Sequence, residues 1–111
     1  MVNITNYKPH SEVTKEMLKD NNFKFMDGIY VYRFPVYKYK KEPMLWCNIY
    51  VDIENDICNL QVVDQRNNTY APFFNREYSA NNVVVEYIDK RIASQIGVFV
   101  KSKILKKRGK E

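Results

Sequence analysis

The sequence predicts an α+β fold: an antiparallel sheet of three or four strands with an N-terminal and a C-terminal helix, in the order α-β-β-β-(β)-α. Two observations support this prediction. Residues 29–63 hold three runs of β-branched and aromatic residues separated by two turn sequences, which is typical of a β-meander. Residues 80–96 repeat apolar side chains at every third or fourth position, the spacing of an amphipathic helix.

Length and charge predict one domain and a basic tail. A chain of 111 residues with 45% hydrophobic and 28% charged residues is large enough for one core and too short for two. The formal net charge is +5, and residues 101–111 carry six basic residues against one acidic residue. We therefore divide the chain into a neutral domain, residues 1–100, and a basic C-terminal tail, residues 101–111. Such a tail favours nucleic acid or another acidic surface. The alternative is a solvated, frayed terminus.

The composition indicates the bacterial cytoplasm. No apolar run approaches the ~20 residues that span a bilayer, and the N-terminal residues contain no secretory signal. Two cysteines do not make a disulfide framework and suggest a reducing compartment. The abundance of Lys, Asn, Ile and Tyr suggests an AT-rich coding genome, such as that of a low-GC bacterium or its phages and plasmids.

The elements follow from local signals. Ser11 is a good N-cap for a helix that runs to about Asn21, and Asp27-Gly28 marks the turn into the first strand. Strands are predicted at residues 29–40, 44–53 and 57–64, with a short fourth strand at 69–74. Ser79 or Asn82 caps the second helix, residues 80–96, and Gly97 fits the position that ends it.

The pairing register follows from which faces must be apolar. A two-residue loop at Asn55-Asp56 pairs Val51 with Leu60, and a turn centred on Lys41-Glu42 pairs Tyr32 with Val51. The alternative register of the first hairpin would bury Arg33 without a partner, a costly arrangement. The predicted inward set is Tyr30, Tyr32, Phe34, Val36, Leu45, Cys47, Ile49, Val51, Ile53, Cys58, Leu60 and Val62.

The same register has two further consequences. It places Cys47 and Cys58 roughly 20 Å apart at about 3.4 Å per residue, too far for a disulfide. Pro35 and Pro72 lack a backbone N–H, so the first and fourth strands are predicted to be edge strands or to contain a bulge.

The outer face of the meander is the predicted binding site. Aromatic and Arg side chains on an open sheet are typical of protein-binding hot spots or of nucleobase stacking. In the alternative interpretation, the first helix or a second subunit of a homodimer covers this face, and its aromatic residues are core. The candidate binding residues are Arg33, Tyr37, Trp46, Tyr50 and Gln61 on the face, Lys38, Lys40 and Lys41 at the first turn, and Lys103, Lys106, Lys107 and Arg108 in the tail.

The sequence carries no catalytic motif, and we predict no catalytic residue, metal or cofactor. His10 is the only histidine, so a His-dependent triad or a multi-histidine metal site is not expected. The acidic residues Asp52, Glu54 and Asp56 fall at a turn; a metal-dependent nuclease built on them is a less favoured alternative. In residues 69–78, the aromatic residues are expected to anchor the strand-to-helix connection, and Asn75, Arg76 and Glu77 to form a turn or a functional loop.

A resemblance gives a more specific expectation. The segments YRFPVYKYKKEPMLWC (32–47) and YAPFFNREY (70–78) look like small proteins carried by phages, plasmids and conjugative elements of low-GC Gram-positive bacteria. Over residues 14–96 the chain is similar in size and plan to type II-A anti-CRISPR proteins, which inhibit Cas9. The resemblance implies a non-enzymatic protein that binds a host protein or ribonucleoprotein and interferes with guide-RNA assembly. The alternative function is a small nucleic-acid-binding protein that uses the aromatic face and the basic tail.

Overall fold

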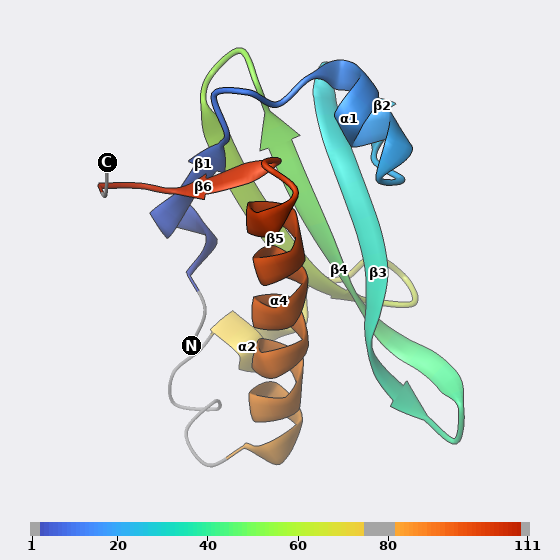
Figure 1. Ribbon diagram of the computed structural model, residues 1–111. Coiled ribbons are helices and arrows are strands. Elements are labelled where there is room, and N and C mark those ends of the chain that lie inside the picture. The colour runs from blue at the N-terminus through green and yellow to red at the C-terminus, as the bar shows by residue number, and fades with distance from the viewer. Residues whose placement is uncertain (1–2, 75–81, 110–111) are drawn as a thin grey trace.

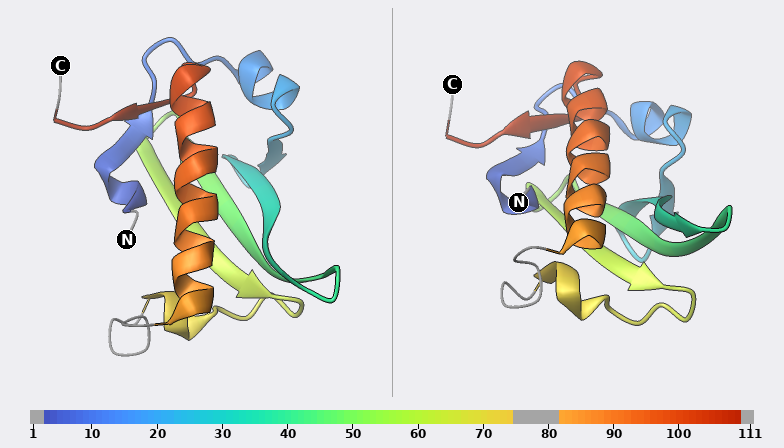
Figure 2. Two further views of the ribbon diagram at one scale, coloured as in Figure 1. Left: turned by 60° about the horizontal axis from the view of Figure 1, so that its bottom comes forward. Right: turned by 90° about the horizontal axis from the view of Figure 1, so that it is seen from below.

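The computed structural model describes residues 3–74 and 82–109 as an α+β fold, in agreement with the sequence prediction. A four-stranded antiparallel sheet has the order β2-β3-β4-β5, and a separate two-stranded ribbon is formed by β1 and β6. The long helix α4 lies along one face of the larger sheet (Figures 1 and 2). The elements are η1 (Ile4–Asn6), β1 (Tyr7–Pro9), α1 (Lys15–Asp20), β2 (Lys24–Met26), β3 (Ile29–Tyr39), β4 (Glu42–Asp52), β5 (Ile57–Asp64), α2 (Ala71–Phe74), α4 (Val83–Lys101) and β6 (Leu105–Lys107).

The meander β3-β4-β5 has the predicted facing, with a register that differs by two residues. Val51 pairs with Tyr30 and with Cys58, where the sequence predicted Tyr32 and Leu60. The first turn is Lys40-Lys41, whose φ angles of 50° and 69° suit a tight hairpin turn. The second loop has four residues, 53–56, between the paired residues Asp52 and Ile57. Because a two-residue shift leaves every side chain on its original face, the predicted inward residues do line the core.

A bulge in β3 changes the position of Tyr37. The register shifts on either side of Tyr37, which pairs with Leu45 instead of Trp46. Val36 and Tyr37 both turn toward the core, and the Tyr37 ring lies 6.3 Å from the ring of Tyr87 on α4. Tyr37 therefore does not belong to the outer face, and its assignment to the candidate site was wrong. The bulge follows Pro35, a residue type found at such irregularities because it has no N–H for the ladder.

The sheet has one strand that the sequence analysis missed. β2 pairs with the first three residues of β3 through the Asp27-Gly28 turn, where both φ angles are positive. Only beyond Val31 is β3 an edge, so the edge prediction from Pro35 holds for the second part of the strand. There Arg91 of α4 donates a side-chain hydrogen bond to the Pro35 carbonyl, at 3.4 Å.

Two short helices differ from the predictions. α1 is capped by Thr14, whose Oγ1 accepts a hydrogen bond from the Met17 N–H, and not by Ser11. The predicted fourth strand is an isolated bridge at Thr69 followed by α2. Pro72 lies in the first turn of α2, where a missing N–H is tolerated. Residues 75–81, which include Tyr78, Ser79 and the proposed loop residues, lie outside the described residues.

Helix α4 is longer than predicted. The Asn82 side chain accepts hydrogen bonds from the Val84 and Val85 N–H groups, so it is the N-cap. The helix continues through Gly97 to Lys101, because Phe99 extends the buried stripe by one more turn. The buried residues of this stripe are Val85, Ile88, Ile92, Ile96 and Phe99.

The C-terminal segment is part of the fold, and its description as a tail outside the domain was wrong. Ile104 and Leu105 are both 0% exposed. β6 pairs antiparallel with β1, and the ladder continues through a hydrogen bond from the Arg108 N–H to the Asn6 carbonyl. The predicted boundary at residue 100 therefore falls inside α4. Burial of two apolar residues within a basic run anchors the segment to the core.

Cys47 and Cys58 are free and buried. Cys47 pairs with Val62, which lies four residues from Cys58 on β5. The two thiols are therefore roughly 14 Å apart along the strands. The separation is shorter than the predicted 20 Å and still excludes a disulfide.

Candidate interaction surface

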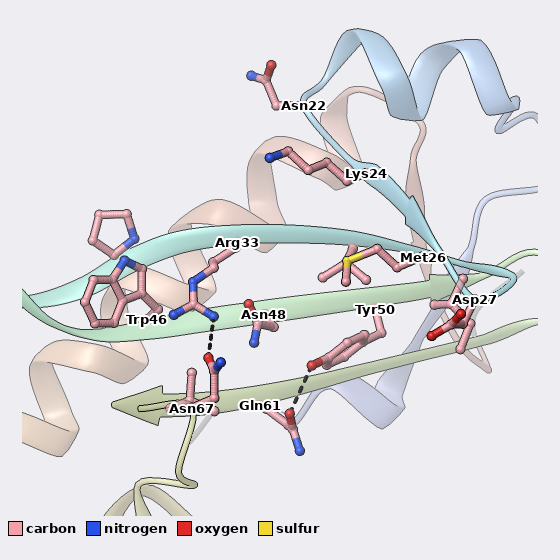
Figure 3. Close-up of a pocket in the computed structure, with 14 residues that line it drawn as sticks. Asn22, Lys24, Met26, Asp27, Arg33, Trp46, Asn48, Tyr50, Gln61 and Asn67 are labelled. Carbon is pink, nitrogen blue, oxygen red and sulfur yellow. Dashed lines mark hydrogen bonds between the residues drawn. The ribbon is translucent and has the colours of Figure 1, made fainter. Parts of the chain in front are cut away.

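The face of the sheet opposite α4 contains a groove of about 780 Å³. Its lining residues come from β2, β3, β4 and β5, from the turn after β5, and from the turns before and after β2, which contribute Asn22 and Asp27 (Figure 3). None comes from α1 or α4. A shallower hollow of about 330 Å³ adjoins it at the Ile57 end of β5. Within the described residues, no helix covers this face, so the interpretation in which α1 covers it was wrong. We call it the outer groove.

Cross-strand pairing arranges the groove in rows. Pro35, Trp46 and Val63 form an apolar row across the three strands. The next row is polar, and its members are Arg33, Asn48 and Gln61; a third row holds Val31, Tyr50 and Asn59. Neighbouring residues in a row lie about 4.5–5.5 Å apart, so the groove offers an apolar strip directly beside a hydrogen-bonding strip.

Arg33 is held in a defined position at the centre of the groove. Its guanidinium carbon lies 5.1 Å from the centre of the Trp46 ring, within the range of a cation–π interaction. Its Nη1 donates a hydrogen bond of 2.9 Å to Oδ1 of Asn67 (Figure 3). Arg33 is exposed, so a bound partner can still reach the guanidinium.

The turn after β5 positions Asn67. Oδ1 of Asp64 accepts hydrogen bonds from the N–H groups of Arg66 and Asn68, at 2.8 and 3.0 Å. These hydrogen bonds lower the pKa of Asp64 below its ordinary value, and the bond from Asn68 contributes most. Asn67 lies between the two donors with a φ of 64°. The Asp64 carboxylate thus supports the partner of Arg33 through the backbone.

A side-chain hydrogen bond orders the polar floor of the groove. The Tyr50 hydroxyl donates a hydrogen bond of 2.9 Å to Oε1 of Gln61. Asn48 is 8% exposed and lies between Arg33 and Gln61 in the polar row. In the described part of the chain, no buried side-chain nitrogen or oxygen lacks a hydrogen-bond partner. The contacts of Arg33 with Asn67 and Trp46 and of Tyr50 with Gln61 preorganise the surface, which lowers the entropy cost of binding.

Apart from Tyr37, which packs toward α4, the structure divides the predicted binding residues into three groups. Four residues lie together in the outer groove: Arg33, Trp46, Tyr50 and Gln61. Three exposed lysines lie at the end of the first hairpin: Lys38, Lys40 and Lys41. The basic residues of the former tail lie in or beside β6 and do not line the groove: Lys103, Lys106, Lys107 and Arg108.

Sequence reasoning missed the contribution of β2 and of the 64–68 turn. Lys24 and Met26 line the groove from β2, and Asn67 lines it from the turn. The Asp-Gly pair at 27–28, flanked by apolar residues, is a strong hairpin signal, and could have identified β2. No local signal shows that Asn67 reaches Arg33, because 34 residues separate them.

Asp52 at the end of β4 and Asp56 in the β4–β5 loop make contacts within the fold. Asp52 accepts hydrogen bonds from the backbone and side chain of Asn55, and Asp56 lies 3.9 Å from the guanidinium of Arg108. The His10 imidazole accepts a hydrogen bond from the Glu12 N–H. Within residues 3–74 and 82–109, no group of three or more His, Cys, Asp or Glu side chains is placed to hold a metal ion. Nor does this part of the chain contain a helix with the length and hydropathy to cross a membrane.

Comparison with known proteins identifies the fold. No family model and no curated protein sequence matches this chain. The crystal structure of a DUF1831 family protein from Lactobacillus plantarum is similar, with a TM-score of 0.64 over 90% of this chain and 84% of that chain. The two sequences are 13% identical, so the likeness is one of fold alone.

Proposed function

We propose that this is a non-enzymatic interaction protein that binds a partner protein in the outer groove. The observation that carries the proposal is the preorganised pair of Arg33 and Trp46 in an uncovered groove on the sheet. Trp, Tyr and Arg are the residues most enriched at binding hot spots, where a few side chains supply most of the affinity. The adjoining apolar and polar rows fit an apolar side chain of the partner flanked by hydrogen-bond acceptors.

The charge of the groove favours a protein over a nucleic acid at this site. Its basic lining residues are Lys24 and Arg33, and Asp27 offsets one of them. Nucleic-acid affinity depends mainly on the number of phosphates that basic residues neutralise. An apolar strip of Pro35, Trp46 and Val63 is more useful to a protein partner, whose apolar surface it can bury.

The partner that we propose is a host nucleoprotein in the bacterial cytoplasm, with Cas9 as the first candidate and guide-RNA assembly as the inhibited step. The likeness of residues 32–47 and 70–78 to small proteins of mobile elements supports this choice. The free, buried thiols of Cys47 and Cys58 suit a reducing compartment.

An order-of-addition experiment tests the proposed partner. A type II-A Cas9 is mixed with the protein before or after the guide RNA, and cleavage of a target DNA duplex is measured. We expect inhibition when the protein is added first and little when the guide is already bound. Equal cleavage in both orders and without the protein would exclude interference with Cas9. A pull-down from host lysate, with and without nuclease treatment, would then identify the partner.

A pair of variants tests the site itself. Trp46→Ala is expected to weaken partner binding by at least about 30-fold, since loss of a hot-spot side chain costs about 2 kcal/mol or more. Tyr87→Ala is the matched control, because Tyr87 is an exposed aromatic residue on α4, outside the groove. Circular dichroism establishes that both variants fold. Equal loss in the two variants, or none in Trp46→Ala, would show that the outer groove is not the binding site.

A further inference from the structure

The positive charge of the protein is concentrated on the side that carries α4 and β6. Residues 83–109 contain seven Lys and Arg residues and two acidic residues, a surplus equal to the +5 of the whole chain. Neither α4, β1 nor β6 contributes a residue to the outer groove. The basic surface and the outer groove are therefore separate. The proposed binding of a partner in the groove assigns no role to the basic surface.

The β1–β6 ribbon displays basic side chains from both of its strands. Lys8 and Lys106 are direct cross-strand partners, and Lys107 is the partner of Tyr7. Side chains in such a pair lie about 4.5–5.5 Å apart, and like charges placed there oppose pairing. The buried pair Pro9 and Leu105 keeps the ribbon in this register against the repulsion. A bound polyanion would relieve that repulsion.

Acidic side chains balance only part of this charge. Glu12 lies 3.5 Å from the ammonium group of Lys103, and Asp56 lies 3.9 Å from Arg108. Among the described residues, no ion pair involves Lys8, Lys101 or Lys107. All three lie near the point where α4 leads into β6 or on the ribbon itself (Figure 1).

We propose that the end of α4 and the β1–β6 ribbon bind the phosphate backbone of a nucleic acid. The ligands are Lys101 on α4, Lys8 and Lys106 on one face of the ribbon, and Lys107 on the other. We call these four residues the ribbon surface. Lysine is a common phosphate ligand and acts as a flexible point charge. The four residues include none of the Trp, Tyr and Arg anchors that mark a protein hot spot. Their charge is independent of base identity, so binding is not sequence-specific. This inference does not depend on the proposed function of the groove.

Salt dependence gives the direct test. Fluorescence anisotropy is measured with the full-length protein and labelled 20-nucleotide single-stranded RNA, duplex RNA and duplex DNA at 50 to 200 mM salt. With four phosphate contacts, the affinity for the single strand should fall about 50-fold over this range, from a slope of about 0.7 per contact. Comparison of the three probes identifies the form of phosphate backbone that is preferred.

Charge-neutralising variants locate the contacts. Lys8→Gln combined with Lys107→Gln removes two contacts, so the fall for the single strand should shrink to about 7-fold. Lys38→Gln combined with Lys90→Gln is the matched control, with the same change in charge. Lys38 is in the hairpin at the opposite end of the molecule from β6, and Lys90 is in the first half of α4. This control should keep the wild-type slope.

Four outcomes would overturn the inference. One is no binding to any probe at 50 mM salt. Another is an equal change of slope in the two double variants. The third is equally tight binding of polyglutamate, which would indicate an acidic protein surface instead. The fourth is loss of RNA binding in Trp46→Ala, which would move the nucleic acid to the groove. This variant separates the two proposals, because it should weaken partner binding by at least about 30-fold and leave RNA binding unchanged.

Discussion

Leu105→Ala is expected to destabilise the protein strongly, because the C-terminal segment belongs to the core. The Leu105 side chain is 0% exposed and is paired on the ribbon with the buried Pro9. Truncation of a buried Leu to Ala costs about 2–5 kcal/mol through lost burial and the cavity left behind. A domain of this size has a stability of roughly 5–15 kcal/mol, so the variant should lose a large fraction of it.

Urea unfolding measures this effect. With an m-value of about 1.5 kcal/mol/M, a loss of about 3 kcal/mol lowers the unfolding midpoint by about 2 M. Lys107→Ala, two positions along the same strand and exposed, is the control, and its midpoint should stay within the small range typical of surface substitutions. If Leu105→Ala unfolds at the wild-type midpoint, residues 104–107 do not pack on the core and the segment is a free tail.

Three further predictions concern the thiols, the turn and the helix cap. Burial raises the pKa of Cys47 and Cys58 from 9.0 to about 12. The contribution of these thiols to stability is therefore complete below pH 9 and declines from pH 9 to about 12. Cys47→Ala should reduce this decline, measured by urea unfolding over the same pH range. The pKa of Asp64 is lowered by hydrogen bonds, first from Asn68, so its contribution is present above the ordinary value of 3.8 and disappears as the pH falls through the lowered pKa. Asp64→Ala should remove this acid dependence and weaken partner binding, and unchanged binding would show that the turn does not position Asn67. Asn82→Ala removes the N-cap of α4 and should cost about 1 kcal/mol in a urea or thermal melt; an unchanged melt would mean that the cap bonds do not contribute.

Much of the fold could be predicted because local patterns carry it. Alternation of apolar and polar residues in β3, β4 and β5 identifies the inward face. The assignment is correct although the predicted register differs by two residues, because such a shift leaves each side chain on the same face. The apolar stripe of α4 identifies the helix, although its end was placed at Gly97. Gly97 was misleading because a helix ends where its buried stripe ends, and Phe99 continues that stripe against the rings of Phe23 and Tyr32.

The candidate site was predicted in part for the same reason. Arg33, Trp46, Tyr50 and Gln61 share a face by alternation alone, and the structure gathers them in one groove. Tyr37 was misplaced because a bulge reverses alternation locally, and the choice between a bulge and a regular pair depends on packing against α4.

Sequence alone determined the fold class, the inward face of the meander and the concentration of charge near the C-terminus, since each depends on periodicity or composition. Only the tertiary structure decided where this charged segment lies. The buried residues Ile104 and Leu105 tie it to the core, and pairing with β1 places it on the ribbon instead of in solvent. It also decided that Asn67 supports Arg33 across 34 residues of sequence. Both outcomes depend on contacts between distant segments, whose balance of burial and charge no local pattern contains.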